Sequence, residues 1–465
     1  MSPATLPSEV TSFIISHLLV PDDPQPAGYI QKPTRIAMYA TVSKEWQKSV
    51  ERHTFSNLYL TPTRLQEFGR IVERKRQKYV RRINLDVVLD AYDEVAFGRY
   101  ESDEDQERNN QVFTRTLQQL FKSLSSWEDD DVADLGVSLS VKVHSPSDLS
   151  CLGQMDARAR RRRRLIGGPK DLLNRRFDRS YLRFVCSQTA GDINHLLHLV
   201  PAISEMDING SGPRHTWPAS CSTIASRTPQ LRSLKLRLWD NERNDLELRK
   251  GARNEFANSI KSWPPSIQKV DLSYYNLPPQ DQSFMPPNIL SEPNSGDLIS
   301  TNLGKFSQQL TELNLDDITI GADFFWNSSF DSLAPHWPHF TSLTVNYNPI
   351  TPAGQWLRER DNFFRHKASP EHMNNLYTAA GKAASFMPAL KELWLSAEFG
   401  GYCPHWFSYK TSPTNACATW CSTPEFKPNE SVLRIWRDVS RKNLGIDLEI
   451  KYINERICFP TNSSS

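Results

Sequence analysis

The chain of 465 residues is predicted to be an α/β protein, in which a helical unit at 1–55 precedes a long repeating region at 56–460. Three observations lead to this prediction. Apolar residues near the start recur at helical spacing, a short apolar pattern typical of strands recurs along the rest, and a helix-like stretch often ending in proline precedes most copies of that pattern. Such an alternation of helices and strands predicts a sheet built from successive strand and helix pairs.

The first predicted helix follows Pro7, which costs no hydrogen bond in the first turn of a helix. The apolar residues behind it are spaced by three and four positions and therefore share one face. They are Val10, Phe13, Ile14, Leu18 and Leu19.

A second amphipathic helix is predicted around Val42, Trp46 and Val50, which are flanked by polar residues. The insert at 20–33 between the two helices contains four prolines and is predicted to be a loop. By periodicity alone, both helices could equally be the core of a small helical domain.

The order of these pieces resembles an F-box, with Leu6, Pro7 and Glu9 at its start and Val42, Ser43 and Trp46 at its end. The resemblance implies docking on the Skp adaptor of an SCF (Skp–cullin–F-box) ubiquitin ligase. The insert is longer than is usual in F-boxes, which costs about a kilocalorie or less in closure entropy. The positions that the family pattern assigns to adaptor binding are Leu6, Pro7, Glu9, Val10, Ile14, Leu18, Val42, Ser43 and Trp46.

The stretch from 55 to 87 resembles F-box proteins of filamentous fungi, in which a short strand and a helix lead into a repeat region. A helix start is predicted either at Thr61 with Pro62 or at Thr63 with Gln66. The apolar stripe of this helix consists of Leu65, Phe68 and Val72.

A pattern of apolar-x-x-apolar-x-apolar residues recurs seven times, and each copy is predicted to be a short strand. This pattern resembles the core of a leucine-rich repeat, whose strands line a concave surface in a solenoid. The copies are Val80/Ile83/Leu85, Ile203/Met206/Ile208, Leu231/Leu234/Leu236, Ile267/Val270/Leu272, Leu310/Leu313/Leu315, Phe340/Leu343/Val345 and Leu390/Leu393/Leu395.

The repeats are irregular, because from Ile203 onward their first positions lie 28, 36, 43, 30 and 50 residues apart. Regular leucine-rich repeats are about 20 to 29 residues long. The sequence therefore predicts an irregular leucine-rich-repeat-like solenoid with inserted loops at 278–300 and 348–375. The alternative is an ordinary α/β domain whose buried strands resemble one another.

Charge is uneven along the chain although the net charge is only +2. Charged loops are predicted near 93–112, which is acidic, and near 153–180, which contains the run Arg158 and Arg160–Arg164. Such a run serves as a nuclear-localisation element, a nucleic-acid contact or simply a solvated loop. Because aromatic residues do not alternate with these arginines, we expect no nucleic-acid partner.

Composition excludes several classes of protein. No apolar segment approaches the roughly 18 residues that cross a bilayer, and the N-terminal apolar run lacks the basic flank of a secretory signal. Seven scattered cysteines indicate reduced thiols and a cytoplasmic or nuclear protein. Neither a metal nor a cofactor is predicted, because the only set with zinc-ligand chemistry has a spacing unlike known zinc motifs. That set is Cys403, His405, Cys417 and Cys421.

No catalytic motif is found in the sequence, and the chain is predicted not to be an enzyme. Asp271, Asp316 and Asp317 lie on predicted strands and are candidates for recognition. Lys235 and Arg237, with Arg232, are candidates for contacting a phosphate. Two alternatives are an F-box scaffold outside ubiquitin ligases and an enzyme, for which a pocket with converging carboxylates would be evidence.

The resemblance to F-box proteins therefore implies a substrate-recognition subunit of a cullin–RING ligase. It would have two partners, the Skp adaptor and an unidentified protein substrate.

Overall fold

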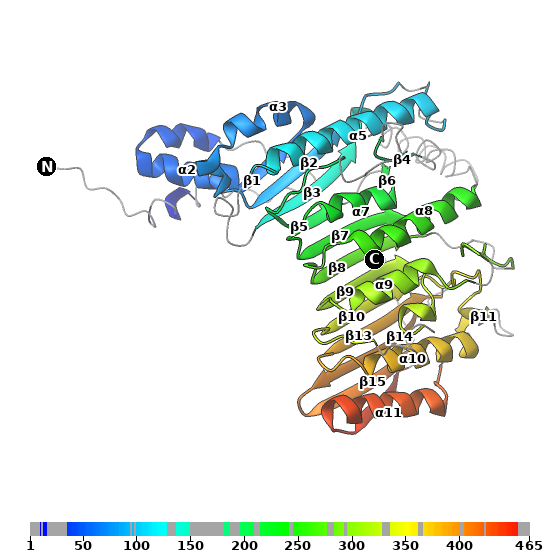
Figure 1. Ribbon diagram of the computed structural model, residues 1–465. Coiled ribbons are helices and arrows are strands. Elements are labelled where there is room, and N and C mark those ends of the chain that lie inside the picture. The colour runs from blue at the N-terminus through cyan, green and yellow to red at the C-terminus, as the bar shows by residue number, and fades with distance from the viewer. Residues whose placement is uncertain are drawn as a thin grey trace, which may run out of the picture.

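A computed structural model of the chain shows a mixed α/β protein with one large, mostly parallel sheet (Figure 1). The structure describes residues 10, 13–15, 35–93, 95–96, 99–127, 136–148, 180–185, 196–208, 214–240, 245–276, 283–292, 295–327, 335–360, 366–399, 404–422 and 425–453.

The sheet has twelve strands in the described part of the chain, and their order in space follows their order in the sequence. Neighbouring strands are parallel from β1 to β13, β14 is antiparallel to both β13 and β15, and β16 is parallel to β15. The strands are β1 Asn57–Leu60, β2 Arg82–Val88, β3 Val137–His144, β5 Ile203–Ile208, β7 Ser233–Trp239, β8 Lys269–Tyr275, β9 Glu312–Ile318, β10 Ser342–Tyr347, β13 Glu392–Glu398, β14 Pro404–Ser412, β15 Asn415–Ser422 and β16 Leu448–Ile453.

Two small pairs of strands lie outside the large sheet. One is parallel, β4 (Tyr181–Leu182) with β6 (His215–Thr216), and the other is antiparallel, β11 (Arg358–Arg360) with β12 (His366–Ala368).

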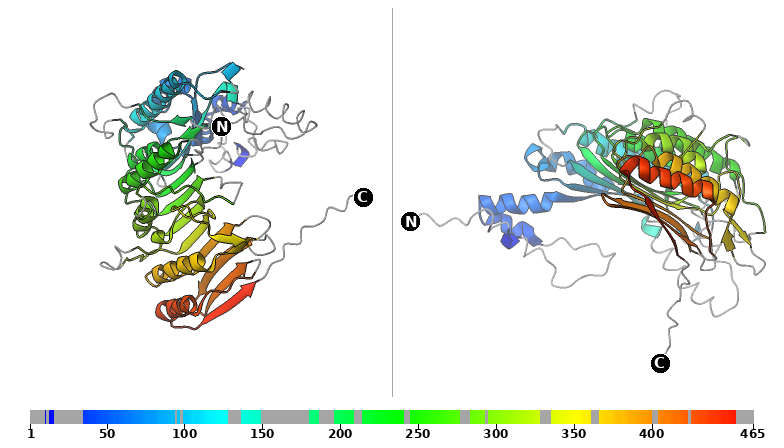
Figure 2. Two further views of the ribbon diagram at one scale, coloured as in Figure 1. Left: turned by 90° about the vertical axis from the view of Figure 1, so that its right-hand side faces the viewer. Right: turned by 90° about the horizontal axis from the view of Figure 1, so that it is seen from below.

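Helices α5, α7, α8, α9, α10 and α11 lie along one face of the sheet (Figures 1 and 2). Among the described residues, no helix combines the length and apolarity that crossing a membrane requires. The helices are η1 Arg35–Thr41, α2 Lys44–Ser56, α3 Pro62–Ile71, α4 Arg74–Gln77, α5 Asp103–Leu124, α7 Pro218–Ser226, α8 Leu246–Ser259, η6 Ile260–Ser262, α9 Leu298–Ser307, η7 Ala322–Phe324, α10 Pro370–Ala384 and α11 Glu430–Leu444.

The strands of the sheet alternate between buried and more exposed residues, as in β2, where Ile83, Leu85 and Val87 are fully buried. Alternate residues point to opposite faces of a strand. One face of the sheet is therefore apolar and packs on the helices in a single continuous core, which extends from Leu60 to Val439. The opposite face is polar, and we call it the open face.

All seven predicted strands are confirmed, because every apolar pattern lies in or beside a strand of the large sheet. Of the two predicted starts of α3, the structure selects Thr61, whose side chain accepts a hydrogen bond from the backbone N–H of Arg64, with Pro62 at the first position. The predicted helix around Trp46 is α2, which runs directly into β1. It begins only at Lys44, after the N-cap Ser43, so Val42 precedes the helix and does not share its apolar face.

Three loop predictions are wrong in part. The acidic segment near 93–112 becomes helical at Asp103, because Ser102 caps α5 and three acids in its first turn favour the helix dipole. The predicted loop at 348–375 contains β11, β12 and the start of α10. The loop at 278–300 contains the start of α9 at Leu298. The insert at 20–33 and nearly all of the loop at 153–180, including its arginine run, lie outside the described residues.

Candidate functional site

The N-terminal helical unit has a small core of its own. Ile15 and Val50 are fully buried against each other, and the partly buried Tyr39, Ala40 and Trp46 surround them. The rings of Tyr39 and Trp46 lie 6.1 Å apart between centroids. This cluster is distinct from the continuous core of the sheet.

Ser43 begins α2 as its N-cap. Its hydroxyl oxygen accepts a hydrogen bond from the backbone N–H of Trp46 at 3.3 Å and donates one to a carboxylate oxygen of Glu45 at 2.9 Å. The cap fixes the start of α2, and the half-buried Trp46 on its first turn then faces the small core. Ser43 and Trp46 therefore stabilise the fold of this unit, and this role does not depend on a binding partner.

Large apolar side chains of the same unit are exposed to solvent. The exposed fractions are 41% for Val10, 63% for Phe13, 61% for Met38 and 61% for Val42. Ile14, between Phe13 and the buried Ile15, is half-buried. Of the predicted adaptor-binding residues, Leu6, Pro7, Glu9 and Leu18 lie outside the described residues. Met38 belongs to the exposed group although the F-box pattern does not include it.

The open face of the sheet presents polar residues in register, and the row ends on a tryptophan. At one level, six neighbouring strands from β5 to β13 each place one residue on this face, because parallel strands align equivalent positions. These residues are Asp207, Lys235, Asp271, Asn314, Thr344 and Trp394.

Asp271 is the centre of this row. Arg237 donates to both of its carboxylate oxygens at 3.0 and 3.1 Å, Asn314 donates at 3.1 Å, and the Lys235 ammonium lies 3.6 Å away. Burial raises the pKa of the neighbouring Asp207, and the charges of Lys235 and Arg237 oppose that shift. The two cations proposed for phosphate contact are thus already paired with Asp271, whereas Arg232 is exposed.

Asp316 and Asp317 lie at the carboxyl end of β9. Asn346 of β10 donates to Asp316 at 3.0 Å, which makes a second polar contact on the open face two residues further along the strands than the row of Asp271. Asp317 has a φ of 50° at a point where the pairing of β9 with β10 shifts, so it is a bulge residue. Backbone in this left-handed region strains a residue with a side chain. Of the three recognition candidates, Asp271 and Asp316 therefore lie on the open face, and Asp317 redirects the strand.

Aromatic residues continue the open face at its C-terminal end. Trp394 on β13 and Trp406 on β14 stack with ring centroids 4.7 Å apart and an interplanar angle of 20°. Both rings are partly exposed. They form an apolar platform at the end of the polar row.

The cysteines and the histidine considered for zinc lie on opposite faces of the sheet. His405 pairs in register with Ser422, whereas Cys421 pairs with Trp406 and Cys417 with Lys410. Both ring nitrogens of His405 are hydrogen-bonded, to the Tyr377 hydroxyl at 2.7 Å and the Ser422 hydroxyl at 3.0 Å. His405 is therefore a core residue that cannot share a metal with Cys417 and Cys421, and Cys403 lies outside the described residues.

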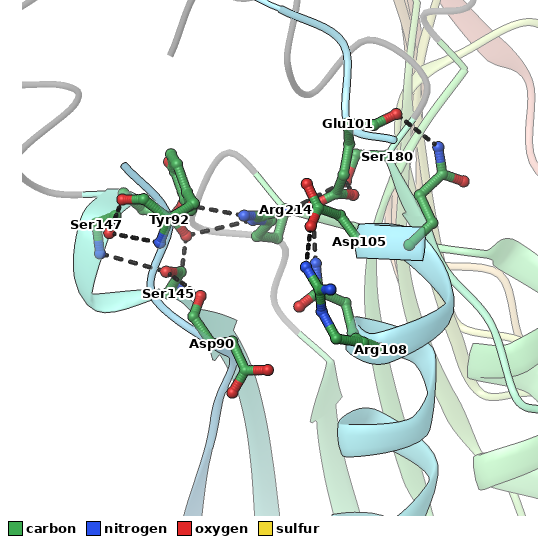
Figure 3. A network of polar contacts seen from close by, with 12 residues as sticks. Asp90, Tyr92, Glu101, Asp105, Arg108, Ser145, Ser147, Ser180 and Arg214 are labelled. Carbon is green, nitrogen blue, oxygen red and sulfur yellow. Dashed lines mark hydrogen bonds and ion pairs between the residues drawn. The ribbon is translucent and has the colours of Figure 1, made fainter. Parts of the chain in front are cut away.

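A buried ionic cluster around Arg214 joins loops at the carboxyl ends of β2 and β3 (Figure 3). The Arg214 guanidinium pairs with Glu101 and with Asp148, and Ser180 donates a hydrogen bond to Glu101. Tyr92 donates to Asp148 at 2.8 Å. Asp148 precedes the predicted charged loop at 153–180 and Ser180 is the last residue of that range, so the cluster brings together the described residues on either side of 149–179.

A pocket of about 260 Å³ lies at the carboxyl ends of β9 and β10, between the start of α9, η7 and the start of α10. Two carboxylates, Asp297 and Asp323, belong to its wall. Burial raises the pKa of Asp323, and the negative charge of Asp297 raises it further. Sequence reasoning missed both residues, because neither belongs to a recognisable motif and only the fold brings their segments together.

Comparison with known proteins covers the C-terminal part of the chain. Residues 264–460 match a family of unknown function, DUF6546. No curated protein matches the chain. The matching segment includes β8 to β16 and every residue of the pocket, and it leaves out the N-terminal helical unit.

Proposed function

We propose that this chain is the substrate-recognition subunit of an SCF-type cullin–RING ubiquitin ligase. In this proposal the N-terminal helical unit is an F-box that docks on the Skp adaptor. The remaining region is an irregular leucine-rich-repeat-like solenoid that binds a protein substrate. The proteins would meet in the cytoplasm, the nucleus or both.

The observation that carries the proposal is the exposed apolar surface of the helical unit. Val10, Phe13, Met38 and Val42 are between 41% and 63% exposed, and in the described part of this unit two apolar residues, Ile15 and Val50, are fully buried. Single exposed apolar residues are ordinary on protein surfaces, but several on one small unit are typical of an interaction site. A helical partner surface such as that of an adaptor would cover them.

The arrangement of the sheet supports the substrate-binding half of the proposal. Strands in chain order with helices along one face are what a repeat protein produces, since each unit packs only on its neighbours. The other face then displays aligned side chains over a long surface. The polar row and the stacked Trp394 and Trp406 are suited to contacting a protein.

Catalysis in such a complex comes from proximity. A substrate lysine held near the ubiquitin-loaded cysteine of another protein reacts in an effectively unimolecular step, so the receptor itself needs no reacting group. This chain would contribute binding and orientation only.

The test is a pull-down of tagged full-length protein from cells, analysed by mass spectrometry. Val42→Asp places a charge on the exposed apolar surface, and the double variant Leu6→Ala, Pro7→Ala removes the start of the F-box pattern. We expect both to lose the Skp adaptor and the cullin that accompany wild type. Met285→Asp is the matched control, because Met285 is 71% exposed and lies outside the helical unit.

Two results would contradict the proposal. If wild type captures neither adaptor nor cullin, the helical unit is not an F-box. Equal capture by wild type and Val42→Asp would show that the exposed surface is not the docking site. Adaptor without cullin or ubiquitylated proteins would instead support the scaffold alternative, in which the F-box acts outside ubiquitin ligases.

A further inference from the structure

The pocket at the carboxyl ends of β9 and β10 has a buried apolar floor and a rim open to solvent. Ile320, Phe325 and Leu357 are among the buried residues of the floor. Ala353 and Gln355, which lie on the rim, are exposed. Its volume of about 260 Å³ is below the roughly 300–1,000 Å³ of pockets for drug-sized ligands. The pocket therefore has room for a single side chain or a small molecule of similar size.

One carboxylate of the pocket is already neutralised. Asp297 caps α9 by accepting a hydrogen bond from the Ser300 backbone N–H at 2.9 Å, and the Arg253 guanidinium lies 3.4 Å from its other oxygen. Arg253 also pairs with Asp240 at 3.0 Å, and Asp240 pairs with Arg249 at 2.7 Å. Two arginines and two aspartates thus form a buried network with no excess charge.

Asp323 adds a third carboxylate next to this balanced network. It is half-buried and accepts a hydrogen bond from the Asp297 backbone N–H, but it forms no ion pair with any described residue. Burying a carboxylate without a cation is costly. The pocket therefore has an excess negative charge over an apolar floor, and His372 and Asn375 of α10 complete the polar part of its wall.

We propose that this pocket binds an ammonium or guanidinium group on an apolar stem, with the cation against Asp323 and the stem on the floor. Long basic side chains combine these two properties, since their methylene groups pack on apolar surface while the charged end is solvated or paired. The inference rests on the proposed function, in which the ligand is a lysine or arginine side chain of the protein substrate. The same chemistry also fits a free organic cation.

The first experiment titrates the full-length chain with pentylguanidinium and with the neutral, similarly shaped pentylurea, followed by ligand-observed NMR. We expect pentylguanidinium to bind at least tenfold more tightly than pentylurea. Asp323→Asn keeps the shape of the side chain and removes its charge, so it should weaken pentylguanidinium binding at least tenfold. Asp447→Asn, at a carboxylate that is 86% exposed and outside the pocket, should leave binding unchanged.

A second variant separates loss of charge from loss of fold. Ala353→Trp places a large ring on the exposed rim, so it should block pentylguanidinium while the unfolding midpoint stays within a degree or two of wild type. Equal binding of the two probes, or full binding by either Asp323→Asn or Ala353→Trp, would overturn the proposal.

The source of the cation is decided by competition. A Gly-Ser peptide with one central arginine should displace pentylguanidinium and bind more tightly than it, whereas the same peptide with glutamine should not. If the arginine peptide binds no better than the small cation, the ligand is a free organic cation and the substrate assignment is wrong. These titrations contain no adaptor, so they succeed or fail independently of the pull-down.

Discussion

The helical unit and the sheet bury their apolar residues in opposite ways. In the sheet, residues as large as Trp337, Trp420 and Trp436 are almost entirely inaccessible to solvent and belong to one continuous core. Among the described residues of the helical unit, the apolar side chains that are fully buried are Ile15 and Val50, whereas Phe13, Met38 and Val42 are each more than 60% exposed.

This difference teaches where each region obtains its stability. Folding free energy comes mainly from apolar surface removed from water, so the sheet is stabilised by its own packing. The described residues of the helical unit keep several apolar side chains at the surface, so we expect this unit to gain stability from a partner that covers them. We therefore expect mutations in the sheet to act on folding and mutations in the unit to act on binding.

The largest effect on stability is expected for Trp436→Ala. The Trp436 ring packs on Phe407 and Tyr409, with centroids 4.7 and 5.0 Å away, and its N–H donates to the Tyr377 carbonyl. α10 packs closely on this ring at Gly381. A Cβ atom added to Gly381 would lie only 3.3 Å from the indole nitrogen of Trp436. Removing the ring leaves a cavity in the core, which should lower the free energy of unfolding by about 3–5 kcal/mol.

Urea unfolding followed by circular dichroism measures this loss, and Trp436→Phe serves as the control because it keeps most of the ring volume. A loss below 1 kcal/mol for the alanine variant would mean that the sheet core is not packed as described. Capture of the adaptor should be the same for both variants.

A smaller and local effect is expected for Ile15→Ala. The substitution shortens a fully buried side chain in the small core around Val50, and it should cost the helical unit about 2 kcal/mol, at the low end for such substitutions. Because the two cores are separate, the sheet should not respond.

Hydrogen exchange read by mass spectrometry distinguishes the two regions. Amides of α2 should exchange faster in Ile15→Ala, whereas those of β9 should exchange as in wild type. Met38→Ala, a substitution at a residue of the same unit that is 61% exposed, should change neither. Faster exchange in β9 would show that the helical unit and the sheet are coupled, and that their cores do not respond independently to mutation.

The smallest expected effect, counted per pH unit, is on the pH dependence of the free energy of unfolding. It also distinguishes the sheet from the helical unit. Burial lowers the pKa of His405 in the sheet to about 3. Below pH 6.5 the unfolded chain therefore binds a proton that the folded chain rejects, so stability that is full above pH 6.5 falls as the pH approaches 3. The loss is about 1.4 kcal/mol per pH unit. In the helical unit, the pKa of the half-buried His53 is also lowered by burial, but solvent near the ring limits its effect.

Unfolding of wild type and His405→Gln at pH 7, 6 and 5 isolates this contribution. The difference in unfolding free energy between the two proteins should decrease with falling pH. A difference that is constant over this range would mean that His405 is protonated in the folded protein.

The strands that the sequence predicts correctly have a local signal. Leu234 and Leu236, like Leu313 and Leu315, alternate with polar residues, and this period is a property of the strand itself. β3 and the antiparallel β14 and β15 were missed. β3 lacks the repeated spacing, and the aromatic residues of β14 and β15, such as Phe407 and Trp420, suggested packing or metal binding more than strands.

The sequence by itself determined the seven strands of the repeated apolar pattern, the side of each of these strands that is apolar, and the helix around Trp46. These features depend on neighbours a few residues apart, so spacing reveals them. The tertiary structure alone decided which distant charges meet. Arg214 pairs with Glu101 across 113 positions, and Asp297 lies beside Asp323 at a pocket that also includes residues of α10. Such contacts depend on how separate elements pack, and the energy of an ion pair depends on the distance and burial that only the folded chain sets.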